Sequence, residues 1–145
     1  MVINIRHTGI VVEDLDKSLE FYINKLGFKI IKQTNETGSF IGQILGIKDL
    51  SVTTVKMILK NQQMIELLDF TSHKKEPKNR FINDIGPTHI ALTVRSLDTL
   101  YKDFMNDGIK FISSPKVSPD GYAKVAFCRA PEGTYIELVE LLKNN

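Results

Sequence analysis

Two histidines and two glutamates in this chain have the residue types and the settings of a metal site. His7 opens the run HTGIVV and His89 opens the run HIALTV, both of which are otherwise mostly apolar or β-branched. Glu66 is enclosed by the apolar run MIELL, and Glu137 by YIELV. An ionised carboxylate among apolar side chains loses much of its hydration free energy unless it is paired or binds a metal. The four residues together therefore predict one site for a divalent transition metal.

These four residues occupy equivalent positions in an internal repeat. The two histidines are 82 residues apart, and the same offset joins other matching pairs: Val12 and Val94, Leu15 and Leu97, Asp16 and Asp98, and Tyr22 and Phe104. The two glutamates are 71 residues apart, so the second copy is shorter in its middle. Two copies predict a paired-sheet fold, because solenoids need three or more units.

The predicted ligands are mixed nitrogen and oxygen donors. Such donors suit Ni, Co, Zn, Mn or Fe(II), and they differ from the thiolates of a closed structural zinc site. In an octahedral geometry, four protein ligands leave two neighbouring positions for exchangeable ligands. These positions can chelate a substrate that bears oxygens on adjacent carbons, or a dicarbonyl. A lone strand histidine or glutamate is more often structural, and only the combination of four equivalent residues favours a metal.

Each copy has the pattern of a strand, a helix and three further strands. Asp14 and Ser96 have the residue types of helix N-caps, and Gly27 and Gly108 follow the predicted helices. Runs of β-branched and apolar residues predict strands at 6–12, 28–33, 52–59 and 63–70, and again at 89–94, 110–112, 122–129 and 134–141. The stretch 38–49 is ambiguous and has room for a short helix.

The alternation of side chains along a strand predicts where both glutamates point. Ile65 and Leu67 share the face that suits packing under a helix, so Glu66 points to the opposite face. The same alternation holds around Glu137, which lies between two apolar neighbours. Both carboxylates are therefore expected on the faces that the helices leave open.

The composition restricts the class of protein. At 145 residues the chain is long enough for a single domain made of two half-domains. Lys and Arg number 19 against 17 Asp and Glu, which does not favour nucleic acid or an anionic membrane as a partner. No apolar run reaches the length of a membrane span, and the N-terminus lacks the pattern of a signal peptide. The single cysteine, Cys128, excludes an internal disulfide and suits the cytoplasm; we expect it to be a small buried residue.

A polar segment separates the two copies. Residues 71–85 are mostly polar, with the run KKEPK from Lys74, and predict a linker between modules at about 1–70 and 86–143. This segment contains His73, the only other histidine of the chain. We expect His73 to be a surface loop residue and not a ligand.

Several phrases of the sequence match one known superfamily. They are HTGIVVEDL from His7, SLEFY from Ser18, LGF from Leu26, IELL from Ile65, GPTHIA from Gly86 and PEGTYIEL from Pro131. With these phrases the chain resembles the vicinal oxygen chelate superfamily. That superfamily includes glyoxalase I, methylmalonyl-CoA epimerase, extradiol dioxygenases and bleomycin-resistance proteins.

The resemblance implies a fold and a ligand set. The fold is α+β: two βαβββ modules within one domain, 1–145, form a curved, mainly antiparallel half-barrel around the metal. The implied metal ligands are His7, Glu66, His89 and Glu137, the same four that the repeat singles out. Methylmalonyl-CoA epimerase usually has Gln where this chain has Glu66, whereas glyoxalase I usually has Glu. The GPTH phrase after a long linker looks more like the epimerase.

The resemblance also implies a reaction, a metal-dependent lyase or isomerase step that removes a proton next to a chelated carbonyl. Glu137 or Glu66 would be the catalytic base, and the small-molecule substrate would be a dicarbonyl, a thioester or another compound with adjacent oxygens. In an epimerase-like enzyme Asp49 is a further candidate acid or base, although a turn aspartate has an ordinary structural explanation. A homodimer is expected, because modules of this superfamily pair within a chain or across chains.

Two alternative functions stay open. A ring-cleaving dioxygenase uses Fe(II) held by two histidines and one carboxylate, and Glu66 would fill a position that this chemistry leaves free. A metal-free binding or resistance protein for small molecules needs the open faces but none of the four ligands.

Overall fold

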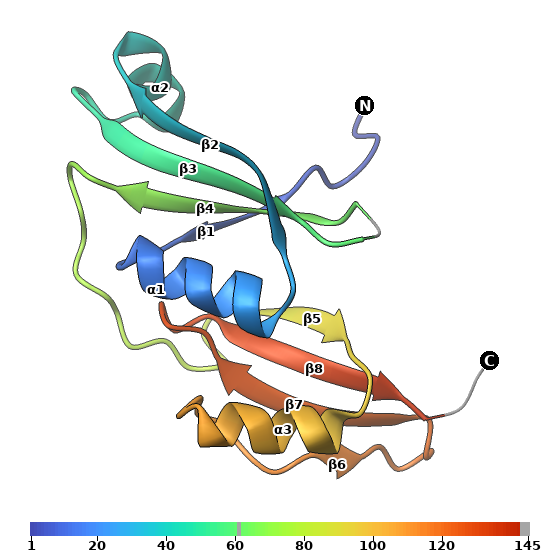
Figure 1. Cartoon of the computed structure of the whole chain (residues 1–145). Helices are drawn as coiled ribbons and strands as arrows, with labels where there is room; N and C mark the ends of the chain where they lie inside the picture. Colours follow the sequence, from blue (N-terminus) through green and yellow to red (C-terminus); the bar gives the residue numbers. More distant parts are fainter. Residues whose placement is uncertain (61, 143–145) are drawn as a thin grey trace. The chain divides into compact units, whose positions relative to one another are not determined.

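Each copy of the repeat forms its own four-stranded sheet in the computed structural model, which describes residues 1–60 and 62–142 (Figure 1). The chain divides into two units, Met1–Pro77 and Lys78–Asn145, and we describe each by itself. The division falls inside the segment 71–85. No helix among the described residues is long and apolar enough to cross a membrane.

The first unit holds one mixed sheet and two helical segments. Its elements, in chain order, are β1 (Thr8–Val11), α1 (Leu15–Leu19), η1 (Glu20–Lys25), β2 (Lys29–Thr37), α2 (Ser39–Leu45), β3 (Ser51–Ile58) and β4 (Met64–Phe70). The strand order is β1-β4-β3-β2. Strand β1 runs parallel to β4, and the other neighbours are antiparallel.

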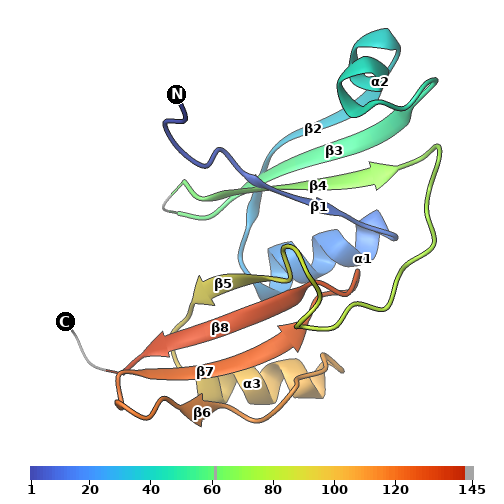
Figure 2. The same cartoon turned by 180° about the vertical axis from the view of Figure 1, so that it is seen from behind.

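The second unit repeats this plan, but its described residues form no counterpart of α2. Its elements are β5 (His89–Thr93), α3 (Leu97–Asn106), β6 (Lys116–Val117), β7 (Ala123–Arg129) and β8 (Tyr135–Leu141). The strand order is β5-β8-β7-β6, again with a single parallel pair, β5 and β8 (Figure 2). The α+β fold of two mainly antiparallel βαβββ modules is thus confirmed. Their joining into a half-barrel stays a prediction.

The strand registers confirm that the two units are copies of one design. In the parallel pair of the first unit, Gly9 lies opposite Glu66. In the second unit, Ala91 lies opposite Glu137. These positions differ by the same offsets, 82 and 71, that relate the histidines and the glutamates in the sequence. His7 comes two residues before Gly9, and His89 comes two residues before Ala91. Residues two apart on a strand point to the same face, so each histidine shares a face with its glutamate.

The opposite face of each sheet is the apolar core. Val55, Met57, Ile65 and Leu67 are almost fully buried in the first unit, as are Phe21 and Tyr22 of the helical segment. In the second unit the equivalent core residues are Ala126, Cys128, Ile136 and Leu138, with Leu97 and Phe104 of α3. Helix α3 packs against β7 and β8 (Figure 1). The helices therefore cover one face and leave the glutamate face uncovered, as the alternation predicts.

Helix α2 is an exception, because it covers one end of the glutamate face of the first unit. Its residue Ile41 packs with Leu50 and Val52, and Leu68 and Phe70 lie against this cluster. Leu68 and Phe70 are two and four positions after Glu66, on the same face. A side chain at Gly42 would lie 2.7 Å from the carbonyl oxygen of Ile47, so this close approach requires glycine. The ambiguous stretch 38–49 thus contains the short helix for which the sequence has room.

Two helix predictions are partly wrong. Asp14 caps α1 as expected, with its carboxylate accepting the backbone N–H of Lys17 at 3.1 Å. The predicted α-helix, however, widens into a π-helix at Glu20–Lys25, and the N–H of Leu26 donates to the carbonyl of Phe21. The π-helical turn contains the buried aromatic residues Phe21 and Tyr22.

In the second unit, Ser96 occupies the N-cap position but its side chain makes no capping bond. Ser96 has a left-handed backbone, with φ of 52°. The N–H of Leu97 instead donates to Oε2 of Glu140 on β8, at 2.9 Å. The carboxylate of Glu140, which is distant in the sequence, therefore caps α3 in place of the Ser96 side chain.

The strand predicted at 110–112 is reduced to one bridge, from Phe111 to Cys128, with backbone hydrogen bonds to β7 at Lys110 and Ile112. The strand in this place is β6, at Lys116–Val117. Residues 113–115 interrupt the pairing: the Ser113 hydroxyl donates to the carbonyl of Ser114 at 3.0 Å, and Pro115 has no N–H to donate.

The segment between the units is fixed at both of its ends. Nζ of Lys74 donates to the carbonyl of Glu13 at 2.8 Å and pairs with Asp69 at 2.9 Å, within the first unit. In the second unit, the carbonyl of Arg80 accepts from Arg129 at 2.9 Å and from the Tyr135 hydroxyl at 3.3 Å. These contacts shorten the free part of the segment to the residues between Lys74 and Arg80.

Candidate functional site

The first unit brings His7 and Glu66 together on its open face. Nε2 of His7 lies 3.8 Å from Oε1 of Glu66. The side chains are 28% and 13% exposed, so solvent reaches both without surrounding them. Nδ1 of His7 is buried and has no hydrogen-bond partner among the described residues. A buried ring nitrogen without a partner is unusual in a purely structural histidine.

The second unit brings together the equivalent pair. Nε2 of His89 lies 3.4 Å from Oε2 of Glu137, with side chains 40% and 23% exposed. The other ring nitrogen, Nδ1, lies 3.0 Å from the hydroxyl of Thr88. The ring of Phe127 packs edge-on against His89, with centroids 5.5 Å apart. His89 is therefore held on two sides while Nε2 stays directed towards the carboxylate.

Within each unit, the His–Glu separation is close to that of two ligands of one metal ion. Each distance is longer than the usual hydrogen bond of about 2.7–3.2 Å. Two ligand atoms that lie about 2.1 Å from one ion, at right or tetrahedral angles, are about 3.0–3.4 Å apart. The pair in the second unit fits this range, and the pair in the first unit exceeds it slightly. The imidazole and carboxylate donors are those that divalent transition metals accept.

The structure separates these residues from the other candidates. Within either described unit, no third His, Cys, Asp or Glu joins a pair. Asp49 is exposed in the turn between α2 and β3, with a left-handed φ of 54°, and no contact among the described residues links it to His7 or Glu66. His73 is an exposed loop residue whose Nδ1 lies 2.9 Å from the Ser72 hydroxyl, as expected. Cys128 is fully buried, as predicted, and burial raises its pKa to about 12.

Three neighbours of the pairs do not follow from the sequence motifs. Lys56 lies opposite Glu66 on β3, and its Nζ is 3.7 Å from Oε2 of that carboxylate. Phe127 lies opposite Glu137 on β7, at the position equivalent to Lys56. Lys56 and Phe127 could be placed only from the register between the antiparallel strands. That register follows from the hairpin and not from a sequence motif. Thr88 stands beside His89 in the GPTH phrase but had no assigned role.

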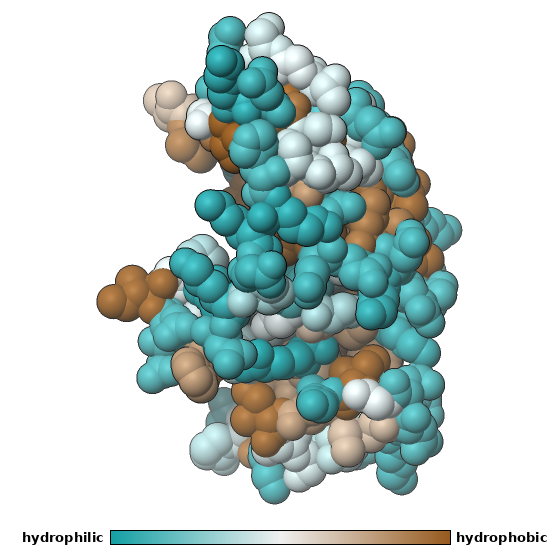
Figure 3. Space-filling view, turned by 90° about the vertical axis from the view of Figure 1, so that its left-hand side faces the viewer, coloured by the Kyte–Doolittle hydropathy of each residue, from teal (hydrophilic) through white to brown (hydrophobic). Residues whose placement is uncertain are grey.

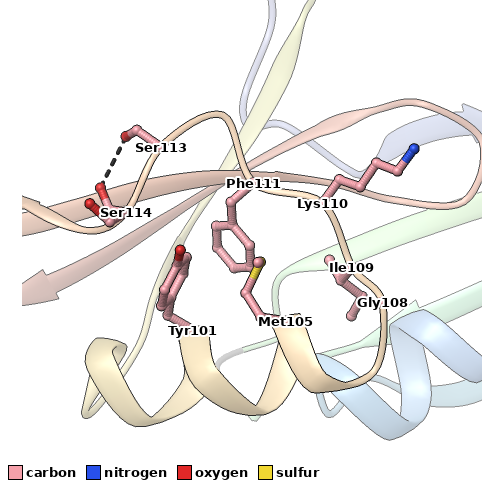
Figure 4. A pocket seen from close by; sticks show the side chains of 8 residues that line it. All are labelled: Tyr101, Met105, Gly108, Ile109, Lys110, Phe111, Ser113 and Ser114. Atoms are coloured by element: carbon pink, nitrogen blue, oxygen red, sulfur yellow. Dashed lines mark hydrogen bonds between the residues drawn. The ribbon is translucent and has the colours of Figure 1, made fainter.

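A separate pocket lies on the helix side of the second unit (Figure 4). It has a volume of about 380 Å³ and lies between α3 and residues 108–114, with Tyr101, Met105 and Phe111 among its lining residues. No histidine, cysteine or carboxylate lines it. Because Glu137 points to the opposite face of the sheet, we assign no chemistry to this pocket.

Comparison with known proteins identifies the family. Residues 4–138 match the model of the Glyoxalase/Bleomycin resistance protein/Dioxygenase superfamily. The chain belongs to this superfamily. The resemblance that the sequence phrases carry is thus confirmed over nearly the whole chain. A probable lactoylglutathione lyase from Synechocystis is 29% identical over 135 residues, which are 92% of each protein.

Solved structures of the glyoxalase superfamily share the fold. A glyoxalase family protein from Bacillus cereus superposes with a TM-score of 0.89 at 23% identity, over 99% of this chain and 97% of that one. The glyoxalase I of Leishmania major, described as trypanothione-dependent, gives a TM-score of 0.67 at 26% identity, over 96% and 87% of the two chains. The superfamily also contains binding and resistance proteins, so membership alone does not assign a reaction.

Proposed function

We propose that the protein is a metal-dependent lyase or isomerase in which His7, Glu66, His89 and Glu137 hold one divalent transition metal. The observation that carries the proposal is the equivalent His–Glu pair in each unit, in the same register and at separations of 3.8 and 3.4 Å. Ni, Co, Zn, Mn and Fe all accept this donor set. The metal, when bound, supplies Lewis-acid stabilisation of the negative charge that develops on a substrate oxygen.

The residues of the chain supply the remaining chemistry. A carboxylate oxygen of Glu137 or Glu66 accepts the proton from the substrate carbon next to the carbonyl and returns it to the neighbouring carbon. Glu137 is favoured, because Phe127 is its cross-strand neighbour, whereas Lys56 holds Oε2 of Glu66. Thr88 fixes the ring of His89 through Nδ1. The apolar neighbours Leu68 and Phe70, beside α2, exclude water from one end of the Glu66 face.

A lactoylglutathione lyase-like reaction is the first candidate. The support is Glu66 in place of the glutamine usual in the epimerase, together with the similarity to the Synechocystis protein over most of both chains. A screen with the glutathione hemithioacetal of methylglyoxal and with methylmalonyl-CoA distinguishes lyase from epimerase activity. If neither substrate gives a product, both of these reactions are excluded. The metal proposal then depends on the metal analysis described next.

The metal proposal is tested by metal analysis of the purified protein and of the double variant His7→Ala/His89→Ala. We expect about one equivalent of transition metal in the native protein and a near-complete loss in the double variant, with the circular dichroism spectrum unchanged. His73→Ala is the matched control, because His73 is exposed in a loop. Full metal content and native activity in the double variant would contradict the proposal.

The proton-transfer role is tested with Glu137→Gln. An amide still coordinates through its oxygen but cannot accept the proton, so turnover should fall by about 100-fold or more while metal content falls far less. Equal losses of metal and turnover would contradict the role.

We also propose a cytoplasmic homodimer as the working form. One free cysteine suits a reducing compartment. Apolar side chains reach the surface in separate patches on the face drawn in Figure 3. The segment before β1 carries Val2, Ile3 and Ile5, which are 89%, 90% and 90% exposed. An edge strand such as β1, preceded by exposed apolar residues, is a common place for chains to associate.

A further inference from the structure

Two lysines lie in one row with the ligand glutamate of the first unit. In the register of the sheet, Glu66 is opposite Lys56, and Lys56 is opposite Lys32. Directly opposed residues of antiparallel strands point to the same face, so all three side chains lie on the open face. Oε1 of Glu66 is directed towards His7, and Oε2 is directed towards Lys56. The carboxylate is thus shared between the histidine and the ammonium group.

Neutralising Glu66 does not explain both lysines. One ammonium group at 3.7 Å balances one carboxylate. Lys32 adds a second positive charge, exposed, for which no acidic partner is found among the described residues. Like charges on directly opposed strand residues are destabilising. The repulsion between Lys56 and Lys32 therefore lowers the stability of the sheet. A divalent metal on Glu66 would raise the local positive charge further.

The repeat does not explain the lysines either. The position equivalent to Lys56 in the second unit is Phe127, which packs against His89. The two units therefore share the His–Glu pair but differ in the residue beside it. One open face is cationic and the other is aromatic, although the backbone is the same.

The geometry points to an anion-binding subsite formed by Lys56 and Lys32 beside Glu66. The substrate therefore carries an anionic oxygen group, such as a carboxylate, near the oxygens that chelate the metal. This inference rests on the proposed function and narrows its substrate class. Lys56 is a specificity-determining residue here, since its side chain is 30% exposed and its ammonium group can turn from Glu66 to a bound anion.

The test compares two chelators with the same metal-binding head. Acetohydroxamic acid is one, and succinic acid monohydroxamic acid, which adds a carboxylate, is the other. Their affinities for the zinc-loaded protein are measured by isothermal titration calorimetry. We expect the carboxylated chelator to bind the native protein about tenfold more tightly, as one charge-assisted hydrogen bond provides. Lys56→Met should reduce this ratio to about one, and Lys32→Met should reduce it in part.

Controls separate this inference from the metal proposal. Lys48→Met, in the exposed turn before β3, should leave the ratio unchanged. Lys56→Met should keep its zinc, because His7 and Glu66 are intact. An equal affinity of both chelators for the native zinc-loaded protein would overturn the subsite alone, and so would an undiminished ratio in Lys56→Met. Loss of zinc from Lys56→Met would make Lys56 a support of the ligand set and would also overturn the subsite. Failure of zinc and of both chelators to bind the native protein would overturn the metal proposal, and the subsite with it.

Discussion

The two histidines differ in the contact that their second ring nitrogen makes. Nδ1 of His89 lies 3.0 Å from the Thr88 hydroxyl, whereas Nδ1 of His7 is buried without a partner among the described residues. When the Thr88 hydroxyl accepts the Nδ1 proton, the lone pair of Nε2 is free for a cation. His89 is therefore oriented through Nδ1 before a metal arrives, while His7 has no such contact at Nδ1 among the described residues.

Thr88→Val should weaken metal binding about tenfold, because it removes the hydroxyl that orients His89. The affinity is measured by competition with a zinc-sensitive dye. Thr93→Val, at an exposed position at the end of β5, is the control and should leave the affinity unchanged. An unaltered affinity in Thr88→Val would show that Thr88 has no orienting role.

Cys128 should make the free energy of unfolding fall at high pH. Burial raises its pKa from 9.0 to about 12. The unfolded chain therefore loses this proton at lower pH than the folded chain. Cys128 contributes stability below pH 9, and that contribution falls as the pH rises from 9 towards 12, by up to about 1.4 kcal/mol per pH unit. Urea unfolding at pH 8 and 10 should show a smaller pH effect in Cys128→Ala than in the native protein; equal slopes would contradict this account.

At the scale of elements, the two module helices begin in different ways. Asp14 is a local cap for α1, and its bond from the Lys17 N–H also lowers the pKa of the Asp14 carboxyl. Helix α3 has its first N–H satisfied by Glu140, a residue of the last strand. The beginning of α3 is therefore stabilised only when β8 is in place.

Glu140→Ala should destabilise the protein by about 1 kcal/mol, because the N–H of Leu97 loses its acceptor. Ser96→Ala should have little effect, since the Ser96 side chain makes no capping bond. The free energies come from urea unfolding curves. A larger loss in Ser96→Ala than in Glu140→Ala would return the capping role to the serine.

The sequence predicts what depends on periodicity and misses what depends on distant contacts. The repeat and the strand alternation are local properties, so they place Glu66 and Glu137 on the open faces correctly. The cap of α3 comes from Glu140, 43 residues after Leu97, and no local pattern contains that information. The position of Lys56 beside Glu66 requires the strand register, and so does the reduction of the strand expected at 110–112 to a single bridge.

At the scale of the whole molecule, light scattering at micromolar concentration should give twice the chain mass of 16.4 kDa. The reason is the exposed apolar segment before the edge strand β1, which is costly to leave in water. Deleting residues 1–5 should shift the mass towards that of a monomer. A monomeric native protein with full metal content would contradict the proposed dimer.

The contacts of Lys74 and Arg80 determine how many residues of the segment between the units are left free. Lys74 is fixed to the first unit and the carbonyl of Arg80 to the second, so the free tether consists of residues 75–79. Six residue steps of extended chain reach about 20 Å at most. A tether of this length gives each module an effective concentration on the order of millimolar with respect to the other. The length of the free tether is therefore set by the contacts of Lys74 and Arg129. Loss of either contact would lengthen the tether without adding a residue.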